Sequence, residues 1–322
     1  MKPLFLLLFS LSLFTLRAQD DLLSQLEASA APTRDFTVAT FKSIRLVNGH
    51  STEQPSEGEL QFLIAHRFGR IGSGGQEFFG LDQASMRIGA EYGITENICV
   101  GFGRSNVQKV WDGFVKWRIV RQQKGMWKVP LTISFFASTS IRSDVYANPE
   151  RQNYFSSRMA YTFQLLIARK FGQWFSLQLM PTLVHRNLVA TRADRNDVFA
   201  LGIGGSLRIT RNARLNAEYY YVFPGQIASP FNNEPVRNSL SIGFDIETGG
   251  HVFQLHFTNA RSMIEKGFIT ETTGDWFPKD FKNFGVQFGF NISRSFALYQ
   301  PKKKMTMYIE KKPRSKSSRK GK

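Results

Sequence analysis

The clearest pattern in the chain is a strict alternation of side-chain character from Asn283 to Ile292. Phe284, Val286, Phe288 and the two apolar residues that follow at the same spacing are separated by small or polar residues. Successive side chains of an extended strand leave the backbone on opposite faces. The pattern therefore predicts a strand with one apolar face and one polar face.

The same period recurs along the body of the chain and predicts twelve strands, most of them long enough for a tilted crossing of a bilayer. The predicted strands are Glu59 to Phe68, Gln83 to Tyr92, Asn97 to Ser105, Asp112 to Arg121, Lys128 to Ser140, Ser156 to Arg169, Trp174 to His185, Asn196 to Ile209, Ala213 to Phe223, Val236 to Ile246, His251 to Thr258 and Phe281 to Ser293.

Alternation alone also fits a soluble antiparallel sheet with one wet face, so the connections between strands decide. Short turns (93–96, 170–173, 210–212, 247–250) alternate with longer connections (69–82, 141–155, 186–195, 224–235, 259–280). This rhythm is typical of a transmembrane barrel with short periplasmic turns and long outer loops. An open sheet edge in a bilayer would leave backbone donors unpaired, so the sheet must close. The predicted fold is all-β: a closed antiparallel up-and-down transmembrane β-barrel of twelve strands.

The first residues have the features of a secretory leader. Met1 and Lys2 supply a basic start, residues 3–16 are largely apolar, and Ala18 offers a small residue for cleavage. The apolar run is shorter than the roughly 20 residues that a membrane-spanning helix needs. We expect residues 1–18 to be a cleaved signal peptide and the mature protein to reside in the outer membrane.

The remaining chain divides into three regions. Residues 59–299 are predicted to form the barrel, and residues 300–322 are predicted to be a disordered basic tail. Residues 19–58 precede the barrel as a lead-in or an extra strand. Within them, the stretch from Asp35 to His50 alternates only weakly, which leaves open an extra strand, a periplasmic lead-in or an inserted plug.

Roughly half of the net charge of +17 lies in the tail, where ten basic residues between Lys302 and Lys322 face one acid, Glu310. In an exported protein the anionic neighbours of such a tail are lipid headgroups or cell-wall carboxylates, so no nucleic-acid partner is expected. A solvated extension without function is the alternative. The content of 30 Phe in a chain of slightly polar mean hydropathy suits an apolar exterior around a wet interior.

Candidate chemistry is sparse. Cys99 is the single cysteine, and the five histidines lack metal-ligand spacing, so neither a metal nor another cofactor is expected. The chain has no catalytic signature and is predicted not to be an enzyme. Two alternatives stay open: a secreted soluble β-protein that binds an anionic polymer, and a lipid-modifying hydrolase of the outer membrane. The hydrolase would use His256 or His185 with a serine such as Ser241 or Ser176.

The polar positions of the strands predict the lumen lining. Opposite charges facing one another there can pair into a plug or line a narrow channel, so we expect a mostly filled interior with at best a small pore. The candidate lumen-lining residues are Arg87, Glu91, Lys116, Arg118, Arg158, Glu218, Asp245 and His256.

Several short motifs resemble a known family. They are His66 to Gly69, Phe78 to Asp82, Arg87 to Ile94, Val100 to Ser105 and Asp112 to Trp117. Together they are similar to a domain-of-unknown-function family of outer-membrane β-barrel proteins from Bacteroidota, over about residues 39–296. The resemblance implies an exported barrel, and it implies no catalytic residue because the family has no established activity. From the predicted barrel itself we expect a structural, binding or passive small-solute transport role. Outer-membrane lipid and the barrel-assembly machinery are the expected partners. Because a tail follows the last strand, the assembly signal is expected at an internal position, near Phe288 to Phe296.

Overall fold

The computed structural model describes residues 34–125, 128–146, 149–150 and 152–299. The predicted signal peptide (1–18), the first part of the lead-in (19–33) and the basic tail (300–322) lie outside these residues.

Twelve strands form a closed barrel in which each strand pairs antiparallel with its neighbours. They are β2 (Glu59–Arg70), β3 (Ala84–Gly93), β4 (Ile98–Ser105), β5 (Val110–Val120), β7 (Thr132–Arg142), β8 (Met159–Phe171), β9 (Phe175–Arg186), β10 (Asp197–Arg208), β11 (Ala213–Val222), β12 (Ser239–Thr248), β13 (His251–Thr258) and β14 (Gln287–Ala297).

The last strand closes the barrel by pairing with the first. The β14–β2 ladder runs from Gln287 opposite Arg70 to Ala297 opposite Glu59, with one register shift near Gly289. The remaining neighbours in the barrel follow one another in the chain, apart from the short β6 between β5 and β7. The predicted fold class and strand number are therefore confirmed, and backbone hydrogen bonding around the wall is continuous in the manner that a bilayer requires.

The start of the last strand differs from the prediction. Residues Phe281–Asn283 form a 3-10 helix, η5, and β14 begins only at Gln287. Gly285 lies against Gly274, where an added Cβ would come within 2.3 Å of the Gly274 Cα. Val286 is consequently buried instead of continuing the apolar outer face. Local packing against residues 274–275 overrides the two-residue period at this end.

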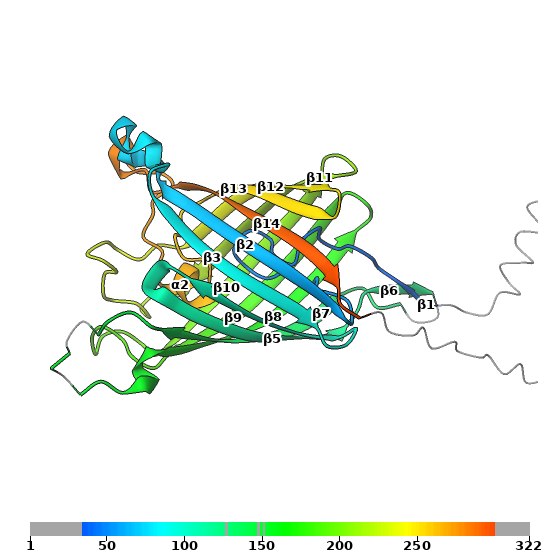
Figure 1. The fold of residues 1–322 in the computed structure, drawn as a ribbon, viewed down its shortest axis with the longest axis horizontal. Helices are drawn as coiled ribbons and strands as arrows, with labels where there is room; N and C mark the ends of the chain where they lie inside the picture. Colours follow the sequence, from blue (N-terminus) through cyan, green and yellow to red (C-terminus); the bar gives the residue numbers. More distant parts are fainter. Residues whose placement is uncertain (1–33, 126–127, 147–148, 151, 300–322) are drawn as a thin grey trace, which may run out of the picture.

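Long loops gather at one end of the barrel and short turns at the other (Figure 1). The long-loop end carries the 3-10 helices η1 (Ile71–Ser73), η2 (Gly75–Gly80), η3 (Val107–Lys109) and η4 (Phe155–Arg158), besides η5. At the short-turn end, β1 (Arg34–Phe36) pairs with β6 (Gln123–Gly125) in a separate two-stranded sheet. No helix in the described residues is long and apolar enough to span a membrane.

Two segments enter the barrel from opposite ends. Residues 39–55, which we call the luminal segment, run into the barrel after β1, and most of them are buried. Residues 259–286, which we call the inner loop, connect β13 to β14 and carry the helix α2 (Glu265–Thr270), which lies within the barrel (Figure 1). The weakly alternating stretch near residue 40 is thus an inserted element, with only a three-residue strand before it.

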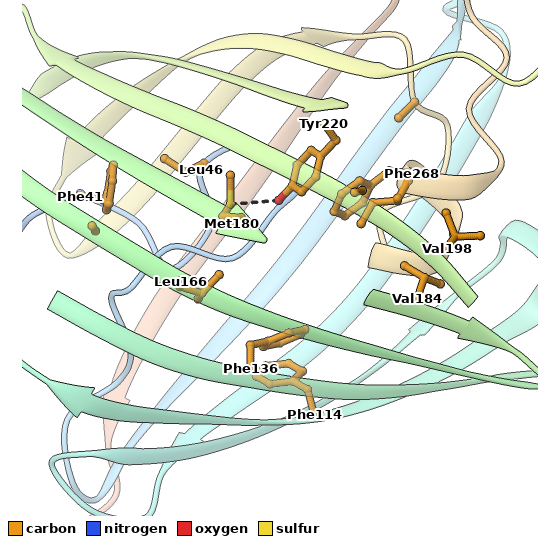
Figure 2. Packing of buried hydrophobic residues seen from close by; sticks show 14 of the residues in the cluster. Phe41, Leu46, Phe114, Phe136, Leu166, Met180, Val184, Val198, Tyr220 and Phe268 are labelled. Atoms are coloured by element: carbon orange, nitrogen blue, oxygen red, sulfur yellow. Dashed lines mark hydrogen bonds between the residues drawn. The ribbon is translucent and has the colours of Figure 1, made fainter. Parts of the chain in front are cut away.

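Part of the barrel interior is apolar. Figure 2 shows Phe41 and Leu46 of the luminal segment and Phe268 of α2 packed against the inward face of the wall. Tyr220 is fully buried in this cluster, where its hydroxyl contacts Met180 Sδ at 3.1 Å and its ring lies 5.0 Å from that of Phe268. The cluster attaches both inserted segments to one side of the wall through hydrophobic burial.

Candidate functional site

The candidate site is the lumen, because polar side chains of the wall point inward at the inserted segments. An irregular backbone buried in this way must find hydrogen-bond partners outside itself. Inward side chains from five strands supply them to the luminal segment. The contacts are Lys116 Nζ to Ser51 O (3.3 Å), Gln178 Nε2 to His50 O (2.7 Å), Arg214 Nη1 to Thr40 O (3.0 Å), Gln254 Nε2 to Leu46 O (3.1 Å) and Asn291 Nδ2 to Val47 O (3.0 Å).

Glu218 of β11 makes the most concentrated contact with the luminal segment. Its carboxylate accepts three successive backbone N–H groups, from Val47 (3.2 Å), Asn48 (2.7 Å) and Gly49 (3.1 Å). Successive N–H groups that converge on one point form an anion-binding concavity. The Asn48 side chain extends the contact by donating to Ser241 Oγ at 2.8 Å. Glu218 therefore acts as the clamp that fixes the turn of the luminal segment against the wall.

The two inserted segments meet inside the barrel. Arg45 of the luminal segment donates from Nη1 to Glu265 Oε1 of α2 at 3.2 Å, and His50 Nε2 lies 3.6 Å from the same oxygen. Arg45 Nη2 is also 3.9 Å from Glu91 Oε1 of β3. Charged side chains thus join the luminal segment, which enters from the short-turn end, to α2 of the inner loop.

A second buried ion pair lies on the wall itself. Arg87 of β3 binds Asp112 of β5 with both ends of its guanidinium, Nε to Oδ1 at 2.9 Å and Nη2 to Oδ2 at 2.5 Å. The guanidinium lies across Gly89 and Gly103, where an added Cβ would come within 2.7 Å and 2.4 Å of it. These glycines make room for a large charged side chain next to the wall.

The remaining candidate residues take different places in the lumen. Arg118 Nη2 donates to Thr52 O at 3.3 Å, and Asp245 accepts from Gln254 Nε2 at 2.8 Å. His256 is buried, and neither ring nitrogen has a hydrogen-bond partner among the described residues. Arg158 lies apart from these, at the long-loop end.

The serine and histidine pairs considered for hydrolysis are not assembled. Ser241 Oγ donates to Thr258 Oγ1 at 2.8 Å, away from His256. Ser176 points inward, where its hydroxyl donates to Thr40 O, whereas His185 faces outward and lies 2.6 Å from Asp197. A nucleophile requires a base within hydrogen-bonding reach, so neither pair forms a catalytic couple. Across the described ranges, no group of three or more His, Cys, Asp or Glu residues is arranged to hold a metal.

A cavity of about 250 Å³ opens at the long-loop end, and we call it the outer cavity. Inward-facing residues at the long-loop ends of β7, β8 and β9 form its wall. Helix α2 forms its floor, and loops 187–196 and 223–238 form its rim. Basic and apolar side chains line it together. The basic residues are Arg142, Arg158, Arg186 and Lys266.

Residues 41–296 match a family described as a membrane bound beta barrel domain, DUF5777. The chain belongs to this family. The match covers the luminal segment from Phe41 onward as well as the twelve strands. The outer surface of the barrel agrees with a membrane location, because large apolar side chains such as Phe102, Phe199 and Phe257 are exposed there. The alternative of a secreted soluble protein is wrong. This DUF5777 protein is a membrane-bound β-barrel.

No curated protein sequence matches the chain. Among solved structures, the NanC porin is similar with a TM-score of 0.45 and 9% identity, over 74% of this chain and 98% of that one. Omp33 of Acinetobacter baumannii has a TM-score of 0.39 and 10% identity, over 76% and 100%. LpxR from Salmonella typhimurium has a TM-score of 0.36 and 9% identity, over 73% and 99%. At these TM-scores the likenesses carry no functional argument.

Two long loops of the DUF5777 barrel are joined through Asp194. Its carboxylate accepts hydrogen bonds from Ser229 Oγ (2.6 Å), from the backbone N–H of Ala228 and Ser229 (2.9 Å each) and from Thr191 Oγ1 (2.9 Å). Burial alone would raise the pKa of Asp194, but these hydrogen bonds, with those from Ser229 first, hold the pKa well below its ordinary value. The carboxylate is therefore ionised at neutral pH and connects loop 187–196 to loop 223–238.

Replacing Asp194 with asparagine should loosen these loops without unfolding the barrel. An amide accepts fewer and weaker hydrogen bonds than a carboxylate, so the amides of Ala228 and Ser229 are expected to exchange hydrogen roughly tenfold faster. Because the folded pKa lies below the unfolded one, the contribution of Asp194 is complete above about pH 4 and declines as the pH falls further. Hydrogen exchange at pH 7 and at pH 3 checks both points. Equal exchange in variant and wild type at pH 7 would contradict the connection.

Proposed function

We propose that this barrel lies in the outer membrane as a non-enzymatic protein that binds or admits small polar solutes, and that the luminal segment closes it at rest. The supporting observation is the match between the polar inner wall and the inserted backbone. Glu218, Gln178 and Gln254 contact a segment of the same chain instead of solvent.

The closure is built from polar contacts, which can be exchanged for contacts with water. A hydrogen bond between neutral groups contributes only about 1 kcal/mol net, and one to a charged group such as Glu218 about 1.5–3 kcal/mol, because water offers a replacement. When a segment is held mainly by hydrogen bonds, water can replace them as it leaves. A hydrophobic core has no such replacement, because water does not compensate for exposed apolar surface. Four apolar residues of the segment, Phe41, Ile44, Leu46 and Val47, are also buried, but they are fewer than the hydrogen bonds that join it to the wall. The segment is thus suited to be displaced while the wall stays intact.

Single-channel recording in planar bilayers tests the proposal. Wild-type protein should show no large, steady conductance, whereas a variant lacking residues 39–55 should conduct steadily. Removing residues 302–322 provides the control and should leave the conductance as in wild type. A large steady conductance of the wild type would overturn the closed state. If neither the deletion variant nor one that also lacks residues 262–272 conducts while both fold, solute passage is excluded.

The biological setting is part of the same proposal. A cleaved signal peptide in residues 1–18 delivers the chain to the outer membrane of a Gram-negative bacterium, and we propose an origin in Bacteroidota on the strength of the resemblance of the sequence motifs. The barrel-assembly machinery recognises the end of β14, near Phe288 to Phe296, and outer-membrane lipid surrounds the wall. The short-turn end faces the periplasm. For the basic tail, Lys302 to Lys322, the proposed partners are cell-wall carboxylates or anionic headgroups.

A further inference from the structure

We propose that the outer cavity binds the carboxylate of a small organic anion, with Arg186 as the principal ligand. This inference rests on the proposed function only in taking the long-loop end as the side from which solutes arrive. The inference concerns binding in the outer cavity, which can be measured without recording any current through the barrel.

Three arginines lie side by side at the cavity wall. They belong to the long-loop ends of three neighbouring strands. Arg142 ends β7, Arg158 directly precedes β8, and Arg186 ends β9. Ile141 pairs with Met159, which places Arg142 next to Arg158, and Ala160 pairs with Arg186. Like charges that face one another across a sheet are destabilising unless an anion lies between them.

Asp144 pairs with two of these arginines, whereas no carboxylate of the described residues lies within ion-pair distance of the third. Asp144 binds Arg142 Nη2 at 2.5 Å and lies 3.9 Å from Arg158 Nη1, while the Arg158 guanidinium stacks over Tyr146 at 3.6 Å from the ring centroid. Arg186 makes no ion pair with a carboxylate in the described residues. It donates from Nη2 to the backbone oxygen of Arg195 at 2.7 Å, and its buried Nε has no partner there.

Two other carboxylates at the cavity, Asp194 and Glu271, attract Arg186 electrostatically but form no ion pair with it among the described residues. Asp194 is occupied by the hydrogen bonds that join the two loops, and Glu271 pairs closely with Lys266. Arg186 therefore keeps an unsatisfied donor at the cavity wall. A guanidinium with free donors in a fixed plane suits a carboxylate or phosphate, which it can bind with two hydrogen bonds.

The rest of the lining indicates an organic anion of limited size. Met159, Leu188 and Ile227 present apolar surface in the same cavity. Small-molecule sites usually measure about 300–1,000 Å³ and combine mostly apolar walls with a few oriented polar groups. A cavity of about 250 Å³ lies just below this range and takes a compact ligand. The ligand class is an anion with one charged group for Arg186 and a carbon skeleton for the apolar surface.

Benzoate and benzamide provide a matched pair of probes, because they have nearly the same shape and differ in charge. Binding of each to the full-length protein in nanodiscs is measured by titration calorimetry. Benzoate should bind at least roughly tenfold more tightly than benzamide, since hydrogen bonds to charged groups are the stronger ones. Arg186→Gln should remove this preference. Equal affinities for the two probes, or no benzoate binding by the wild type, would overturn the inference.

A control variant separates the site from general effects of charge. Arg104 lies on the outward face of β4, where its guanidinium is 5.0 Å from the Trp111 ring centroid. Arg104→Gln makes the same substitution outside the cavity and should bind benzoate as wild type does. Both variants must keep the heat-modifiable gel mobility of a folded barrel. If folded Arg186→Gln still prefers benzoate as strongly as wild type, Arg186 is not the ligand. Such a result leaves the closed-barrel proposal untouched, because conductance is measured separately.

Discussion

Replacing Gly49 with valine is expected to displace the luminal segment and turn a closed barrel into a conducting one. A Cβ at this position would lie 2.0 Å from the Tyr220 hydroxyl oxygen and 3.4 Å from Glu218 Oε2. Tyr220 cannot give way easily, because it is fully buried between Met180 and Phe268. Overpacking of this kind costs about 1–3 kcal/mol.

The substitution also removes the strongest contact of the luminal segment. Moving residue 49 away from the wall withdraws the N–H groups that converge on Glu218, and hydrogen bonds to a charged group contribute about 1.5–3 kcal/mol each. The wall would be intact, because these contacts are separate from the strand ladders. Steady current in planar bilayers and faster hydrogen exchange in residues 40–52 are the expected readouts.

Gly75 offers the matched control for this experiment. It lies in η2 at the long-loop end, and an added Cβ there would meet no atom within 4 Å. Gly75→Val should therefore leave both conductance and exchange as in wild type. If Gly49→Val keeps residues 40–52 as protected as in wild type, the tight approach to Tyr220 does not hold the segment in place.

The wall of the barrel could be predicted from the sequence because its determinants are local. An apolar exterior and a polar interior require a two-residue period, and β12 shows it directly: Ile242 and Phe244 face outward, while Asp245 faces inward. Turn lengths then gave the order of the strands. The prediction was wrong where a close approach of two backbones overrides the period, as between Gly285 and Gly274.

The path of the luminal segment could not be predicted in the same way. Its contacts join residues far apart in the chain: Asn48 and Ser241 are separated by 193 positions, and Arg45 and Glu265 by 220. The sequence did indicate that something fills the lumen, because it places many charged and amide side chains on the inward face and buried polar groups require partners. That signal indicates a filled lumen without identifying which segment fills it.

The pattern of the sequence did not predict the apolar part of the interior, for a different reason. Phe136, Leu166 and Met180 face inward from strands that also carry apolar residues outward. Such strands lose the contrast between faces on which the two-residue period depends. The three arginines of the outer cavity are equally hard to find from sequence, because only the strand register brings Arg142, Arg158 and Arg186 together.

Replacing Asp112 with alanine is expected to destabilise the wall of the barrel strongly. Arg87 would keep its buried position beside Gly89 and Gly103 but lose the carboxylate that binds both ends of its guanidinium. Removing one partner of a buried ion pair typically costs about 3–5 kcal/mol, because the remaining charge is left without compensation. Urea unfolding of the barrel in lipid vesicles measures the loss.

Two further variants show whether the cost comes from the unpaired charge. The double replacement of Arg87 by methionine and Asp112 by alanine removes both charges and should recover much of the lost stability, since buried pairs are often replaceable by apolar residues. Arg237→Ala breaks an ion pair with Asp275 in which the arginine side chain is 45% exposed, and should cost no more than about 1 kcal/mol. If Asp112→Ala proves as mild as Arg237→Ala, water reaches Arg87. The lumen beside β3 and β5 would then be wetter than the packed interior described here.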